Sequence, residues 1–81
     1  MEENYFTIQQ LAYFNGEYGA PAYIAVNGVI YDVTESALWK FGRHQVIHLA
    51  GKDLTEELKD APHGEDLLKK FRVVGFLLDE E

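Results

Sequence analysis

The sequence predicts one small α+β domain, and three observations support this. The length of 81 residues suits a single domain. Two runs of β-branched and aromatic residues flank Asn27-Gly28, a pattern typical of a β-hairpin. Short apolar windows around these runs begin at capping residues and end at glycine or proline, which indicates short helices. No repeat, linker or low-complexity segment divides the chain, so we expect residues 1–81 to form one domain.

The first half of the chain combines a short helix with the hairpin. Thr7 can cap a helix while Gln10 completes a capping box, and we expect this helix to run to about Phe14. The runs at 22–26 and 29–33 should form the hairpin, because a type I′ turn requires positive φ angles that asparagine and glycine adopt readily. Thr34 is then expected to cap a short helix over 35–41.

The second half carries all three histidines within one short window. The segment with His44 and His48 predicts a short helix or an irregular turn; in a helix the two would share one face. Asp53 should cap the next helix, and Pro62 should end it, which places His63 just beyond.

The C-terminal part should add one more helix and the closing strand. The helix is expected over 65–71 and the strand over 72–78, with Gly75 marking a bulge.

Composition excludes several classes of function. Seven basic against fourteen acidic residues give a net charge of −7, which argues against binding nucleic acid or anionic membranes. The sequence has no cysteine, so disulfides and thiolate metal sites are excluded. It shows no signal peptide and no run of about 20 apolar residues. We therefore expect a soluble, cytoplasmic monomer, for which a bound cofactor can supply extra stability.

The histidine window is the main candidate for chemistry. Neutral imidazoles are good ligands for haem iron, and two of them fill both axial positions. A zinc site could use His44, His48 and His63, although the metalloprotease motif requires glutamate where Gln45 stands. The third alternative is that the histidines are ordinary surface or core residues. Their spacing alone does not distinguish a haem site, a zinc site and this alternative. Ser36 lies in no nucleophile elbow, and no phosphate loop is present, so we do not expect an enzyme.

Four motifs, spread over nearly the whole chain, resemble the cytochrome b5-like haem/steroid-binding domain family. They are the opening Phe6–Leu11 with Asn15-Gly16, the hairpin Tyr23–Thr34 ending in Tyr-Asp-Val-Thr, the segment Ala50–Thr55 followed by His63, and the closing Phe71–Gly75.

The resemblance implies an electron-transfer module that holds low-spin haem b between two histidines. His63 matches the second haem ligand of the family. The typical first-ligand motif, His-Pro-Gly-Gly, is missing, which leaves His44 and His48 as rivals for that position. We choose His44, because it follows Gly42 in a loop, where the family presents its first histidine.

Apolar and acidic residues near His63 complete the expected site. The apolar residues would form the wall of the haem pocket. Alternatively, they only pack in the hydrophobic core. The acidic residues would surround the haem edge and steer a basic redox partner, and their alternative is a solvated face. The expected wall consists of Ile47, Leu54, Leu58, Leu67, Leu68 and Phe71, and the acidic residues are Asp53, Glu56, Glu57, Asp60, Glu65 and Asp66.

A second branch of the family offers an alternative function. The opening of the chain, through Ile24–Gly28, is also similar to the membrane-associated progesterone receptor group, which lacks the second histidine and uses tyrosine toward haem. That similarity implies a module that binds haem or a steroid-type ligand without transferring electrons. The presence of His63 favours the bis-histidine branch.

Overall fold

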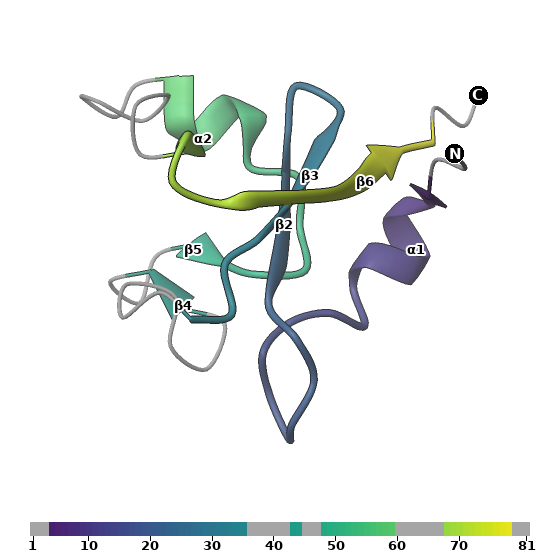
Figure 1. Ribbon diagram of the computed structural model, residues 1–81, viewed down its shortest axis with the longest axis vertical. Coiled ribbons are helices and arrows are strands. Elements are labelled where there is room, and N and C mark those ends of the chain that lie inside the picture. The colour runs from purple at the N-terminus through teal and green to yellow at the C-terminus, as the bar shows by residue number, and fades with distance from the viewer. Residues whose placement is uncertain (1–3, 36–42, 45–47, 60–67, 79–81) are drawn as a thin grey trace.

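The computed structural model describes residues 4–35, 43–44, 48–59 and 68–78 (Figure 1). A sheet of four strands in the order β1-β6-β3-β2 forms the centre, and β4 and β5 form a separate pair. Strand β1 runs parallel to β6, whereas the β2–β3 and β3–β6 pairs are antiparallel. The α+β prediction is confirmed. The elements are β1 (Tyr5–Phe6), α1 (Ile8–Leu11), β2 (Tyr23–Val26), β3 (Val29–Asp32), β4 (Arg43–His44), β5 (His48–Leu49), α2 (Thr55–Lys59) and β6 (Arg72–Leu77).

The predicted hairpin is present as strands β2 and β3. Val26 pairs with Val29 across the turn, and Asn27 and Gly28 have φ angles of 53° and 80°. Both central residues thus have the positive φ that a type I′ turn requires.

Helix α1 begins as predicted but ends early. The Gln10 amide donates to the Thr7 hydroxyl at 3.0 Å, and the Thr7 amide donates to the Gln10 side chain at 2.9 Å. The α-helix ends at Leu11 rather than Phe14, because the amides of Tyr13 and Phe14 bond to carbonyls three residues back, in tighter turns. Gly16 follows with a φ of 80°.

Of the two alternatives expected around His44 and His48, the helix was wrong at the described residues. Arg43 pairs with Leu49 and His44 with His48 in the antiparallel β4–β5 ladder. A helix of only seven residues is marginal in water. Residues 45–47 themselves lie outside the described part, as do most of the helices expected over 35–41 and 65–71.

The expected irregularity in the last strand occurs beside Gly75. Ile30 pairs with Gly75 while Tyr31 pairs with Val73, so Val74 is the extra residue of the bulge.

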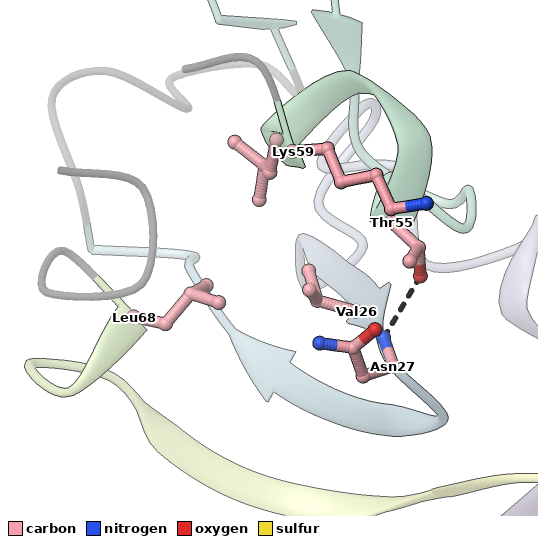
Figure 2. Close-up of a pocket in the computed structure, with 6 residues that line it drawn as sticks. Val26, Asn27, Thr55, Lys59 and Leu68 are labelled. Carbon is pink, nitrogen blue, oxygen red and sulfur yellow. Dashed lines mark hydrogen bonds between the residues drawn. The ribbon is translucent and has the colours of Figure 1, made fainter. Parts of the chain in front are cut away.

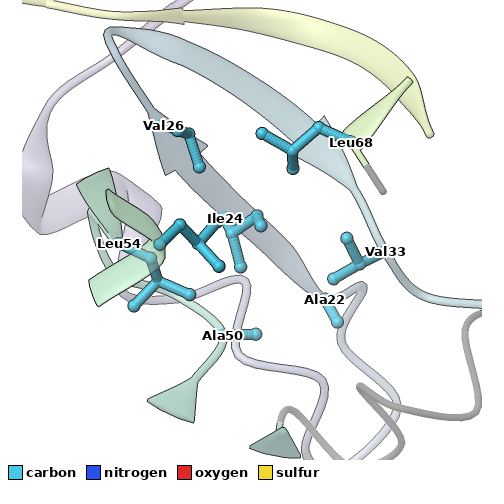
Figure 3. Close-up of a cluster of buried hydrophobic side chains, with 8 residues drawn as sticks. Ala22, Ile24, Val26, Val33, Ala50, Leu54 and Leu68 are labelled. Atoms are coloured by element: carbon cyan, nitrogen blue, oxygen red, sulfur yellow. The ribbon is translucent and has the colours of Figure 1, made fainter. Parts of the chain in front are cut away.

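Two apolar clusters lie on opposite faces of the hairpin. Alternate residues of β2 divide between them: Ile24 and Val26 face the larger cluster, and Ala25 belongs to the smaller one. The larger cluster also receives side chains from the segments before and within α2 (Figure 3). Its buried members are Ala22, Ile24, Val26, Val33, Ala50, Leu54, Leu58 and Leu68, and those of the smaller cluster are Leu11, Ala25 and Ile30.

Candidate functional site

A groove opens on the side of the hairpin that carries the larger cluster. Its narrow end has a volume of about 190 Å³ and lies between the hairpin turn, α2 and Leu68 (Figure 2). Its wider end has a volume of about 470 Å³ and shares Val26, Asn27 and Leu68 with the narrow end. We call the two together the hairpin groove. Its lining consists of Val26, Asn27, Val29, Tyr31, Thr55, Leu58, Lys59, Leu68, Lys69, Phe71 and Val73.

Four residues of the expected pocket wall come together here. Leu58, Leu68 and Phe71 line the hairpin groove, and Leu54, only 1% exposed, packs in the cluster beneath it. Ile47 and Leu67 lie outside the described residues, so their place in the wall stays a prediction.

The hairpin supplies wall residues that the sequence analysis missed. Val26 and Tyr31 line the groove from β2 and β3. The alternation of side chains along each strand indicates that one face of the hairpin is buried. It does not indicate which face of the strand packs against α2.

Hydrogen bonds tie the start of α2 to the hairpin turn. The Asp53 carboxylate accepts from the Thr55 amide at 3.0 Å and from the Thr55 hydroxyl at 2.5 Å. The same hydroxyl accepts from the Asn27 amide at 2.8 Å. Asp53 therefore stabilises the helix start as predicted, although Glu56, the expected partner in a capping box, forms an ion pair with Lys59 instead.

A second Asp-x-Thr motif repeats this arrangement at the other end of β2. Thr34 donates its amide to Asp32 at 2.9 Å and its hydroxyl at 2.5 Å, and its hydroxyl accepts from the Ala22 amide at 2.9 Å. Val33 and Leu54, the middle residues of the two motifs, are buried in the larger cluster. The two motifs thus hold both ends of β2 and anchor the groove wall.

Replacing either threonine with valine is expected to lower the free energy of unfolding. Thr34→Val should cost about 1–3 kcal/mol, because the amide of buried Ala22 loses its acceptor. Thr55→Val should cost only about 1 kcal/mol, because the Asn27 amide is exposed and water can replace the hydroxyl. Urea denaturation followed by circular dichroism measures both, with the matching serine variants as controls. Equal stability of the valine and serine variants would contradict this view of the motifs.

The histidines are described only in part. The Cα atoms of His44 and His48 are partners in the β4–β5 ladder, so the backbone presents both residues at one place in the fold. His63 lies outside the described residues. Among the side chains that the structure does describe, no group of three or more potential metal ligands occurs. The choice of ligands therefore stays a prediction.

Comparisons with known proteins identify the class to which this fold belongs. The family model of the cytochrome b5-like heme/steroid binding domain matches residues 7–77. The chain belongs to this family. Among curated protein sequences, none matches the chain.

Solved structures agree with this assignment. A cytochrome b5 domain protein from Hadesarchaea is 55% identical, with a TM-score of 0.89, over 93% of this chain and 99% of that chain. A cytochrome b5 domain protein from Methanococcoides burtonii is 48% identical, with a TM-score of 0.90, over 95% of this chain and 100% of that one. A protein from Arabidopsis, described as a candidate steroid-binding protein, is 24% identical with a TM-score of 0.66 over 96% and 100%, and shows the fold alone.

The described lining of the hairpin groove suits the apolar body of a ligand such as haem, and no histidine belongs to this described lining. Leu58, Leu68 and Phe71 give it an apolar wall, and cationic side chains lie at its rim. Ligand pockets are generally apolar clefts of this size with a few polar groups. Within the described ranges, no helix has the length and apolar character needed to cross a membrane.

Proposed function

We propose that this chain is a haem-binding electron-transfer module, in which His63 and one histidine of the β4–β5 pair ligate a low-spin haem b. One observation carries this proposal. The segment with His63 leaves α2 at Lys59 and rejoins the described chain at Leu68, and both of these residues line the hairpin groove. The described residues on either side of the segment with His63 therefore both lie at the groove, and histidine is a strong haem ligand.

The residues around the groove would hold the haem and control its redox potential. Bound haem supplies an iron that changes its charge by one electron. If His63 and one histidine of the β4–β5 pair held the haem, their imidazoles would occupy the coordination sites that oxygen or a substrate needs. The apolar side chains of Leu58, Leu68 and Phe71 exclude water, which sets the local dielectric and hence the redox potential.

The acidic surface supports a basic redox partner. Glu56 and Glu57 are exposed on α2, at one wall of the groove, and the net charge of the chain is −7. Opposite charges on a partner would accelerate the encounter, an effect that added salt weakens. Asp60, Glu65 and Asp66 lie outside the described residues, so their contribution to this surface stays a prediction.

Haem titration followed by carbon monoxide tests the proposal. We expect the purified chain to take up one haem and, after reduction, to bind no carbon monoxide, because both axial positions are filled. Uptake of haem with carbon monoxide binding would instead favour the ligand-binding alternative of the progesterone-receptor type. A chain that takes up no haem would contradict both.

Separate alanine variants of His44 and His48 identify the first ligand. We expect His44→Ala to convert the haem-loaded protein to a high-spin spectrum, and His48→Ala to leave it low-spin. The two Cα atoms are partners in one ladder, so each variant is the matched control for the other. Loss of the low-spin spectrum in His48→Ala alone would reverse the assignment.

A further inference from the structure

The lining of the hairpin groove, as far as the structure describes it, contains two lysines and no acidic side chain. Lys59 lines the narrow end, and Lys69 lines the wider end. A separate hollow shares Phe71 with the groove, and there Lys70 and Arg72 lie beside Asp32 and Glu35. The cations of the groove itself are therefore Lys59 and Lys69.

Lys59 is the cation at the narrow end. Its aliphatic stem forms part of the wall, and its ammonium lies at the Thr55 end of the pocket (Figure 2). It forms an ion pair with Glu56 at 3.5 Å, in which the side chains are 66% and 81% exposed. Exposed pairs of this kind contribute little to stability, so the ammonium can exchange Glu56 for another carboxylate at small cost.

Asn27 adds neutral hydrogen-bonding groups to the narrow end, from the hairpin turn. Its backbone amide donates a hydrogen bond to the Thr55 hydroxyl. Its exposed side chain lines the pocket and points from the hairpin turn toward Leu68 (Figure 2). A cation and an amide donor at the mouth of an apolar pocket match a ligand with an apolar body and a carboxylate at its end.

We propose that Lys59, together with the side-chain amide of Asn27, binds the carboxylate of an apolar ligand whose body occupies the hairpin groove. A haem propionate and the head group of a fatty acid both present this chemistry. The haem case rests on the proposed function above, and the fatty-acid case does not.

Three probes separate these cases: ferric haem, its dimethyl ester, which lacks free carboxylates, and decanoate. Dissociation constants are measured for the wild type, Lys59→Gln and Lys59→Arg. Lys52→Gln is the matched control, because Lys52 is an exposed lysine on the segment before α2 and does not line the described groove. Circular dichroism establishes that each variant is folded.

We expect Lys59→Gln to weaken haem binding about tenfold, as loss of one charge-assisted hydrogen bond predicts. Lys59→Arg and Lys52→Gln should bind haem like the wild type. Binding of the dimethyl ester should be weaker than that of haem and should not change in Lys59→Gln.

The other outcomes are distinct. Equal affinity of the wild type for haem and its ester, or equal weakening in Lys59→Gln and Lys52→Gln, would overturn the Lys59 site and leave haem binding intact. Decanoate binding that depends on Lys59, without any uptake of haem or ester, would support the site and overturn the proposed function. Failure of all three probes to bind would overturn both.

Discussion

Replacing His63 with alanine is expected to abolish the low-spin spectrum of the haem-loaded protein. If His63 ligates the haem as proposed, the variant would keep only one histidine ligand, and the iron would be left open or would take up water. Haem affinity should fall on the order of 100-fold. Replacing a residue that only hydrogen-bonds to a metal ligand already lowers metal affinity about 10–100-fold, and His63→Ala would remove the ligand itself. Absorption spectra and a haem titration of the variant measure both effects.

Added imidazole provides the control for this variant. If His63 acts as an axial ligand, free imidazole should bind at the open position and restore the low-spin spectrum to His63→Ala. Circular dichroism of the haem-free variant should match that of the wild type. If the variant kept both the low-spin spectrum and the haem affinity of the wild type, His63 would not be a haem ligand.

Replacing Gly75 with alanine is expected to lower the free energy of unfolding by about 1–3 kcal/mol, the usual cost of overpacking. An added Cβ would lie 2.6 Å from the Asn4 carbonyl oxygen and 2.7 Å from the ring of Phe6. The same carbonyl accepts the Phe76 amide at 2.8 Å, so β1 cannot move away without weakening its pairing with β6. Gly75→Val should be more destabilising still. Urea denaturation followed by circular dichroism measures the change.

Gly19→Ala separates this steric effect from backbone strain. Gly19 has a φ of 88°, and a Cβ there would meet nothing within 4 Å. Its replacement should cost only about 1 kcal/mol, the difference between glycine and other residues in left-handed backbone. If Gly75→Ala were no less stable than the wild type, the close approach of β1 to β6 would be wrong.

Local chemistry predicted the elements that depend on neighbouring residues. The turn at Asn27-Gly28 and the capping box of Thr7 and Gln10 both follow from contacts within a few residues, and both are confirmed. The β1–β6 and β4–β5 pairs were not predicted. Strand β1 has only two residues, and its partner lies about 70 residues further along the chain, so no local pattern marks it.

The candidate site shows the same division between local and long-range information. Leu54 and Leu58 were predicted as wall residues close to His63 in the sequence, and the structure buries both. Val26 and Tyr31 were missed, because the face that a strand turns toward a helix depends on the order of the whole sheet. The two lysines of the groove, Lys59 and Lys69, were also missed, since net charge gives only a sum, not the placement of charges on the surface.

Low-temperature electron paramagnetic resonance of the ferric, haem-loaded protein tests the bis-histidine haem most directly. Two imidazole ligands hold the iron in its low-spin state. We therefore expect a low-spin signal in the wild type that converts to a high-spin signal in His63→Ala. A high-spin signal in the wild type, with the iron fully loaded, would contradict ligation by two histidines.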